Sequence, residues 1–136
     1  MRVVMFEIRD GLLYTKEHVW ILVDGKNAKF GVTDYAQHET GEIVYVETPT
    51  LDTYVKKDEE IGAVESIKSV EPIYAPVTGT IIEVNDVLKD TPNVINQEPF
   101  DGGWIAVIEM DNLSEINDLE NSEEYKKRIN SSITSP

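Results

Sequence analysis

Short apolar and β-branched runs, each followed by Gly, Pro, Asp or Asn, recur along the chain as far as Met110. Short strands with turn signals between them are typical of an all-β sandwich or barrel, whereas βαβ units alternate strands with longer helical patterns. The pattern therefore predicts a mostly β fold, with strands over His18–Val23, Ala28–Val32, Glu42–Glu47, Ile61–Ser66, Val70–Tyr74, Gly79–Val84 and Trp104–Met110.

Two turns between these strands are predicted from their residue types. Asp24-Gly25 separates two strand-like runs, and both residues tolerate the positive φ of a tight hairpin turn. The segment Pro76-Val77-Thr78-Gly79 predicts a second turn, in which Gly79 adopts a backbone conformation closed to other residues.

Helices are predicted in two regions of the chain. The first is a short helix that begins after Thr33 or Asp34 as the N-cap and ends at Gly41. After residue 110 the chain becomes polar, and Ser114 and Ser122 are suitable N-caps for two further short helices.

The C-terminal region has helix-stabilising charge pairs at i,i+4 spacing, namely Glu123/Lys127 and Glu124/Arg128. The polar end from Asn130 to Pro136 is expected to be frayed. We therefore predict a single domain over residues 1–136, with a core over about 12–110 and a C-terminal helical appendage over about 114–130.

Composition narrows the possible functions. The chain has 136 residues and is 40% hydrophobic, enough for one packed core. The net charge of −14 opposes binding to nucleic-acid phosphates and suits transient docking on basic partners, although solubility alone explains it equally well. The apolar runs are too short for a membrane span. The N-terminus resembles neither a signal nor a transit peptide, which favours a cytoplasmic protein.

Few residues in the chain are suited to catalysis or metal binding. The sequence has no cysteine, which excludes disulfides, thiolate catalysis and cysteine zinc sites. The two histidines, His18 and His38, would need mostly carboxylate partners to hold a metal, so no metal site is predicted. Without a nucleophile–base pair either, the chain is not expected to be an enzyme.

Lys68 is the candidate for chemistry. Two strand-like runs meet at Ile67-Lys68, so a hairpin there would present one lysine at its tip. The turn lacks Asn-Gly or Asp-Gly, so this prediction rests on the flanking runs alone. By spacing, Lys68 is one of nine lysines, and an ordinary exposed lysine explains it as well.

Five stretches, in order and in register, resemble glycine cleavage system H proteins. Glu65-Ser66-Ile67-Lys68 is similar to the lipoylation motif of that family, and Gly79 follows the lysine by eleven residues, as in lipoyl domains. The resemblance covers the chain from about Leu12 to Arg128. The other four stretches are Tyr14–Trp20, Gly31–Gln37, Gly41–Pro49 and Val94–Trp104.

This resemblance implies a lipoyl-type flattened β barrel-sandwich hybrid with short peripheral helices, and lipoic acid amide-linked to Lys68. It implies a non-catalytic, monomeric shuttle with four partner enzymes. A pyridoxal-phosphate (PLP) glycine decarboxylase loads an aminomethyl group, a folate-dependent aminomethyltransferase removes it, and a flavin (FAD) dihydrolipoamide dehydrogenase reoxidises the dithiol. The fourth partner is the lipoate-attaching enzyme. The missing cysteines agree with this, because the redox sulfurs arrive with the cofactor.

The residues near Lys68 are expected to serve recognition. Glu65 and Glu71 would stabilise an ammonium group, so they are poor candidates for activating the lysine as a nucleophile. Glu65, Ser66 and Ile67 are expected to be a ligase-recognition hairpin, together with Gly79 in a structural role. Plain solvation of the hairpin is the alternative for Glu65. Biotin carriers with Met-Lys-Met and 2-oxoacid dehydrogenase lipoyl domains with Asp-Lys-Ala fit less well.

The resemblance also implies a shallow pocket for the arm, lined by small polar and acidic side chains, and here the sequence departs. The expected contacts are His18, Val19, Tyr35 and Pro72. Val19 replaces an acidic residue of the family, and Pro72 stands at the second lining position, four residues after the lysine. Each charge-assisted hydrogen bond lost to a protonated aminomethyl group would cost about 1.5–3 kcal/mol. The alternative function is therefore an H-like lipoyl protein that donates lipoate or carries it in sulfur-compound oxidation.

Overall fold

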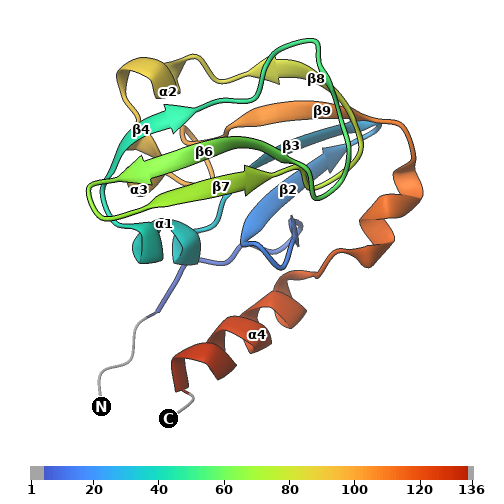
Figure 1. The fold of residues 1–136 in the computed structure, drawn as a ribbon. Coiled ribbons are helices and arrows are strands. Elements are labelled where there is room, and N and C mark those ends of the chain that lie inside the picture. The colour runs from blue at the N-terminus through green and yellow to red at the C-terminus, as the bar shows by residue number, and fades with distance from the viewer. Residues whose placement is uncertain (1–4, 135–136) are drawn as a thin grey trace.

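The computed structural model describes the backbone of residues 5–134 and the side chains of residues 5–130. Two antiparallel sheets face each other without closing into a barrel (Figure 1). The larger sheet has the strand order β1-β2-β3-β9-β8-β5, with β1 Leu13–Tyr14, β2 Val19–Asp24, β3 Asn27–Val32, β9 Ala106–Met110, β8 Gly79–Val84 and β5 Tyr54–Val55. The smaller sheet has the order β4-β6-β7, with β4 Ile43–Glu47, β6 Glu60–Ser66 and β7 Val70–Tyr74.

The predicted mostly β sandwich is confirmed, and all seven predicted strands are present within two residues of their expected ends. The Asp24-Gly25 turn joins β2 to β3, and Gly25 has a φ of +62°. The predicted reason for Gly79 was wrong, because its φ is not positive and it is already the first residue of β8. A Cβ at this position would instead collide with the carbonyl oxygen of Glu109 on β9.

The helix predicted after Thr33 is confirmed as α1, Asp34–Thr40. Thr33 is its N-cap, because the Thr33 hydroxyl accepts a hydrogen bond from the Ala36 N–H, and Gly41 ends it with a φ of 88°. Two four-residue helices, α2 Val87–Asp90 and α3 Val94–Gln97, were not predicted, because they are too short to show a helical period in the sequence. Within residues 5–134, no helix is long and apolar enough to cross a membrane.

The C-terminal helices are present, but their predicted caps were wrong. The short 3-10 helix η1, Leu113–Asp118, is capped by Asn112 rather than by Ser114. Helix α4, Ser122–Thr134, is preceded by Asn121, which exchanges two hydrogen bonds with Glu124 at 3.0 and 2.9 Å. Such a reciprocal capping box satisfies two backbone N–H groups at the helix start. The backbone is helical to Thr134, four residues beyond the predicted end of the appendage at about 130, and residues 135–136 lie outside the described residues. Fraying from Asn130 stays a prediction.

Two hydrophobic clusters stabilise the molecule. The main cluster lies between the two sheets and contains Val19, Ile21, Ile73, Ile81 and Ile108, among others. The second cluster attaches α4 to the larger sheet and consists mainly of Tyr14, Trp20, Phe100, Tyr125 and Ile129. Tyr14 and Tyr125 are stacked, with ring centroids 4.4 Å apart. Figure 1 shows α4 lying along the side of the molecule on which α1 and the start of β2 are found.

Candidate functional site

A tight hairpin between β6 and β7 presents Lys68 to solvent. Glu65 pairs with Val70 in the sheet, and the chain reverses through Ser66–Ser69. The Ser66 N–H donates to the Ser69 carbonyl oxygen at 2.9 Å, and the Ser69 N–H donates to the Ser66 hydroxyl at 3.2 Å. The two serines therefore close a turn that lacks an Asn-Gly pair. The predicted hairpin is present, with its tip at the left of Figure 1.

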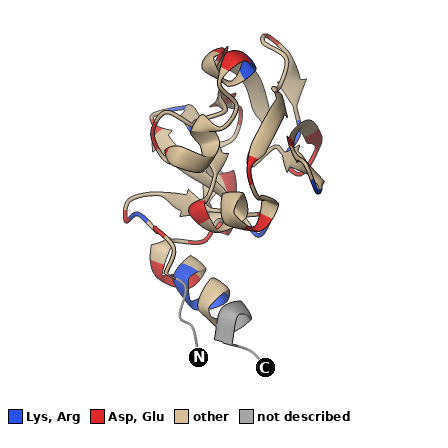
Figure 2. Cartoon of the chain, turned by 90° about the vertical axis from the view of Figure 1, so that its left-hand side faces the viewer, with Lys and Arg blue, Asp and Glu red and all other residues tan. Residues whose placement is uncertain are grey.

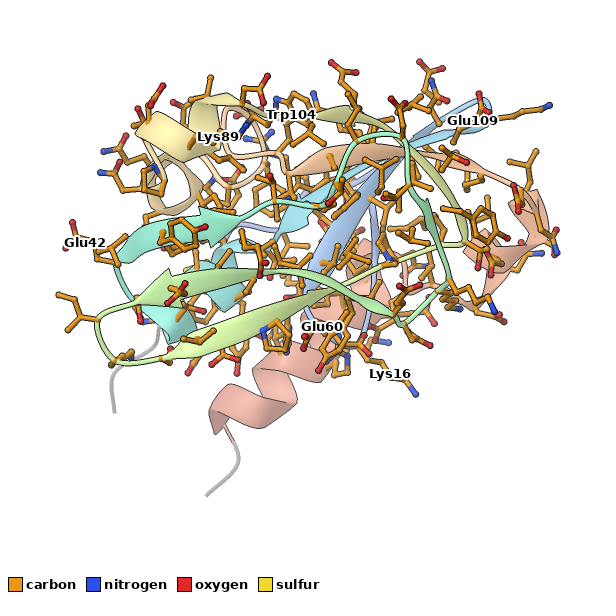
Figure 3. All side chains as sticks on the ribbon, turned by 45° about the horizontal axis from the view of Figure 1, so that its top comes forward. Lys16, Glu42, Glu60, Lys89, Trp104 and Glu109 are labelled. Atoms are coloured by element: carbon orange, nitrogen blue, oxygen red, sulfur yellow. The ribbon has the colours of Figure 1, made fainter. Side chains whose placement is uncertain are left out.

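The Lys68 side chain lies across the end of α1. A Cβ placed on Gly41 would be 3.2 Å from the Lys68 Cε, so glycine at this position leaves room for the lysine stem. Thr40, Gly41 and Glu42 line a shallow hollow together with hairpin residues 66–68. Figure 3 shows Glu42 beside the hairpin tip. The same glycine that ends α1 therefore also permits the observed path of the lysine side chain.

A larger cleft of about 470 Å³ lies next to this hollow, between α1, β7 and the turn before β2. Thr40 lines both, so the cleft begins close to the lysine stem. The apolar lining residues are Val32, Ala36, Val64 and Pro72. The polar lining residues are Glu17, His18, Tyr35, Glu39, Thr40, Glu71 and Tyr74. The cleft thus combines apolar surface with three carboxylates.

The structure brings three of the four predicted arm contacts, His18, Tyr35 and Pro72, into this cleft. Val19 is not among the lining residues, because its side chain is buried in the main cluster between the sheets. The expected Val19 contact was therefore wrong. The preceding residue, His18, has a φ of 65°, and this left-handed turn precedes the strand in which Val19 faces the core.

The sequence predicted an acidic pocket and placed Glu71 near Lys68, but it did not assign Glu17 or Glu39 to the pocket. Glu17, Glu39 and Glu71 come from the turn before β2, from α1 and from β7, and only the folded chain brings them together. The sequence did indicate Glu17 as a candidate. It stands two residues before Val19, and it is more acidic than the small polar side chains expected in the pocket. For Glu39 no local motif was available.

His18 is held in the wall of the cleft by Tyr125 of α4. The Tyr125 hydroxyl lies 2.9 Å from His18 Nδ1 and 2.7 Å from the Thr33 hydroxyl, so it bonds both. The His18 ring also packs against Tyr35, with centroids 4.6 Å apart. Burial lowers the pKa of His18 to about 4, and the positive charge of Arg128 acts in the same direction. His18 is therefore a neutral, hydrogen-bonded structural residue at pH 7.

This depressed pKa predicts a pH dependence of stability. In the unfolded chain His18 binds its proton near pH 6.5, whereas the folded chain does so only near pH 4. The contribution of the neutral ring is thus present above pH 6.5 and is lost as the pH falls to about 4. Because the ring also lines the open cleft, we expect a loss of about 2 kcal/mol.

The measurement is the free energy of unfolding of the wild-type chain and of His18→Asn between pH 7.5 and 4.5. Asparagine tolerates the positive φ and does not titrate in this range. The stability gap between the two proteins should narrow on acidification, and the His18 ring signals in an NMR titration should shift with a midpoint near pH 4. A midpoint near 6.5 would contradict the proposed burial effect.

Residues 12–132 match the glycine cleavage H-protein family. The chain belongs to this family. It is 47% identical over 119 residues to the glycine cleavage system H protein of Geobacillus kaustophilus, which covers 88% of this chain and 94% of that one. It is 43% identical over 124 residues to a probable glycine cleavage system H protein of Haloarcula marismortui, covering 91% and 98% of the two chains.

The fold agrees with the same family. The crystal structure of a glycine cleavage system H protein from Mycobacterium marinum superposes with a TM-score of 0.83 and 29% identity, covering 90% of this chain and 99% of that chain. The resemblance seen in five sequence stretches is therefore confirmed, and so is the lipoyl-type architecture. Proteins of this family are lipoate-carrying components of the glycine cleavage system.

Proposed function

We propose that Lys68 carries lipoic acid through an amide at Nζ, and that the chain moves the aminomethyl group from the glycine decarboxylase to the aminomethyltransferase. The observation that carries this proposal is the position of Lys68 at the tip of a serine-closed hairpin, with its stem directed over Gly41 beside the cleft. Family membership supports the same role. The attached group would supply a redox-active dithiolane, which a chain without cysteine lacks.

The residues around Lys68 fit a long aliphatic arm. The stem crosses Gly41, and the adjoining cleft offers apolar surface from Val32, Val64 and Pro72. Each methylene that leaves water for such a surface contributes about 0.8 kcal/mol. The cleft is open, so the arm can bind there between partners and leave it again. This surface would shelter the loaded arm from water while the carrier moves from one enzyme to the next.

The carboxylates of the cleft suit a protonated aminomethyl group. Glu17, Glu39 and Glu71 line the cleft and supply negative charge. The two family positions that are Val19 and Pro72 in this chain supply none, and Pro72 contributes only apolar surface. The alternative function, in which the arm does not carry an aminomethyl group, rests on Val19 and Pro72 together. Since Val19 lies in the core and three other carboxylates line the cleft, the lipoate-donor or sulfur-oxidation alternative loses that support.

The remaining parts of the role belong to the partners. We infer that the chain itself is non-catalytic and monomeric, and that decarboxylation, transfer and reoxidation take place on the PLP, folate and FAD enzymes. A lipoate-attaching enzyme acts before them. What this chain provides is a lysine held at a fixed site on an antiparallel hairpin, a cleft beside it, and a strongly acidic surface.

The direct test is co-expression with a lipoate-attaching enzyme, followed by intact-mass measurement and peptide mapping. We expect one lipoyl group, on the peptide that contains Lys68. Lipoate on another lysine, or on none, would refute the proposal. The lipoylated chain is then supplied to a glycine decarboxylase, and the exchange of bicarbonate carbon into glycine is measured. Absence of exchange with correctly lipoylated chain would favour the alternative function.

The cleft carboxylates give a further prediction. The double variant Glu17→Gln/Glu71→Gln keeps the shape of the cleft and removes two charges. We expect the exchange rate to fall about tenfold, which corresponds to about 1.4 kcal/mol of lost stabilisation. The matched control is Glu83→Gln/Glu109→Gln, which removes two exposed charges from β8 and β9 and should leave the rate unchanged. Equal effects of the two doubles would mean that only net charge matters.

A further inference from the structure

Asn96 of α3 holds the connection between α1 and β4 through three hydrogen bonds. Its side-chain nitrogen donates to the Gly41 carbonyl oxygen at 2.9 Å and to the Gln37 side-chain oxygen at 2.8 Å. Its side-chain oxygen accepts from the Ile43 N–H at 2.9 Å. An asparagine amide has two donor hydrogens, and both are used here. One side chain therefore ties the end of α1 to the start of β4.

Gly41 depends on this support. It has a φ of 88° and leaves room for the Lys68 stem, whose Cε would lie 3.2 Å from a Cβ on Gly41. Glycine moves between backbone conformations more freely than other residues, so the residue that admits the stem is also the least constrained one of the connection. Its N–H donates to the Gln37 carbonyl oxygen at 3.0 Å, and its carbonyl accepts from Asn96. The second of these two bonds is the one that Asn96 supplies.

Two hollows adjoin the lysine hollow, and an arm on Lys68 has to lie in one of them. Thr40 leads to the cleft, whereas Gly41 and Glu42 also line a hollow of about 360 Å³ beside α3, the α3 hollow. Its other lining residues are Gln37, His38, Asn93, Asn96 and Gln97. These side chains are polar, whereas the cleft offers the apolar surface that an aliphatic arm prefers. Gly41 stands between the two, so its position decides on which side the stem lies.

We propose that Asn96 is a positioning residue for the lipoyl arm. By holding Gly41, it fixes the connection against which the Lys68 stem lies, and it thereby directs the attached group along the cleft and away from the α3 hollow. Asn96 acts through Gly41 and the lysine stem, and not on the cargo itself. This inference rests on the proposed function of Lys68. Figure 1 shows α1, α3 and the hairpin tip together at one end of the molecule.

The test compares Asn96→Asp with the matched control Asn85→Asp. In the first variant, a carboxylate oxygen replaces the donor to Gly41 and repels its carbonyl. The Asn85 amide also donates to two oxygens, the carbonyls of Gly102 and Trp104 at 2.9 and 2.7 Å, and accepts one backbone N–H. It lies directly after β8 and lines neither the cleft nor the lysine hollow. Urea unfolding establishes conditions under which both variants are folded.

The first measurement needs no attached group. In the unmodified wild-type chain, the Lys68 Cε protons should give a nuclear Overhauser effect to the Gly41 Hα protons, since the structure places the stem against this glycine. The effect should persist in Asn85→Asp and should be lost in Asn96→Asp at about pH 8. A general loss of stability, which both variants share, would not remove it from one variant alone.

The second measurement follows the loaded arm. Each lipoylated protein is loaded by glycine decarboxylase, the enzyme is removed, and the release of formaldehyde into water is recorded. In this release, water replaces the thiol sulfur on the methylene carbon, which yields formaldehyde, ammonium and the free dithiol. We expect release from Asn96→Asp to be about fivefold faster than from wild type at about pH 8, because one hydrogen bond changes an equilibrium by about that factor. Release from Asn85→Asp should match wild type.

Acidification should rescue the Asn96→Asp variant. The introduced carboxyl group faces two oxygen acceptors, at an end of the molecule where acidic segments outnumber basic ones (Figure 2). It therefore takes up a proton at a higher pH than an ordinary aspartate, and can then donate to Gly41 again. At about pH 5.5 the nuclear Overhauser effect should return, and release relative to wild type should slow. Asn96→Ala keeps the titratable neighbours Asp34, His38 and Glu42 but has no donor, so it should not recover.

The outcomes separate the two proposals. If the wild-type chain is not lipoylated on Lys68, or accepts no aminomethyl group once lipoylated, the proposed function fails. If wild type is loaded and Asn96→Asp releases formaldehyde no faster than Asn85→Asp, the positioning inference fails alone. Equally fast release from Asn96→Asp and Asn96→Ala at both pH values would assign the effect to a loosened fold and would also overturn the inference.

Discussion

Replacement of Lys68 by arginine is expected to abolish lipoylation completely and to reduce glycine–bicarbonate exchange to background. Arginine keeps the positive charge and a similar length at the hairpin tip. Its guanidinium group, however, stays protonated in proteins and offers no nucleophilic amine. The measurement is the intact mass after co-expression with a lipoate-attaching enzyme, followed by the exchange assay with glycine decarboxylase.

The matched control for this variant is Lys89→Arg. Lys89 is an exposed lysine of α2 and lies away from the hairpin (Figure 3). Lys89→Arg should gain one lipoyl group at the wild-type rate. Lys68→Arg should unfold at the wild-type denaturant concentration, because the side chain is exposed and the Ser66–Ser69 turn does not depend on it. A lipoyl group on the Lys68→Arg chain would disprove Lys68 as the attachment site.

The second large effect is expected from Gly79→Ala, which should destabilise the fold by about 3 kcal/mol or more. Gly79 is the first residue of β8 and pairs with Met110 on β9 and with Val55 on the edge strand β5. A Cβ there would collide with the Glu109 carbonyl oxygen and lie 2.8 Å from the Ile108 side chain. Backbone of a neighbouring strand cannot move without breaking ladder hydrogen bonds. Urea unfolding measures the change in the free energy of unfolding.

Gly25→Ala is the control that separates collision from backbone strain. Gly25 has a φ of +62°, but a Cβ on it would meet nothing within 4 Å. Only the left-handed conformation is then penalised, by about 1 kcal/mol. Gly79 lies in the larger sheet and Lys68 in the smaller one, so folded Gly79→Ala chain should still be lipoylated. Normal stability combined with lost lipoylation would instead favour a direct role of Gly79 in recognition.

The fold was predictable wherever the signal was local. The seven longer strands follow from short β-branched runs with turn residues between them, and α1 follows from Thr33 and Gly41 at its ends. The two-residue strands β1 and β5 and the four-residue helices α2 and α3 are too short to show a period. The caps of η1 and α4 were misassigned by one or two positions, because Asn and Ser both cap well and Asn112 and Asn121 stand two and one residues before the predicted Ser114 and Ser122.

In the candidate site, too, only the parts with a local sequence signal were predictable. Lys68 was predictable, because its motif is continuous in sequence. The pocket for the arm was predictable from the resemblance, with His18, Tyr35 and Pro72 in its lining. Its carboxylates were not, because Glu17, Glu39 and Glu71 come from segments that meet only in the folded chain. Val19 was misplaced for a further reason. Side chains alternate between the two faces of a strand, but the alternation alone does not say which set faces the core. The left-handed conformation of His18, just before β2 begins, decides this for Val19.

The hydrogen bonds of Tyr125 have a consequence for the order in which the molecule is completed during synthesis. Tyr125 bonds His18 and Thr33, which lie before β2 and at the start of α1, so one residue near the C-terminus supports two parts of the cleft wall. Lys68 lies in the turn between β6 and β7, and the smaller sheet that contains these strands is complete at Tyr74. On the ribosome, the lysine hairpin therefore emerges some fifty residues before the helix that holds His18 in place. The hairpin that carries Lys68 can form first, and the cleft becomes complete only when the last helix has docked.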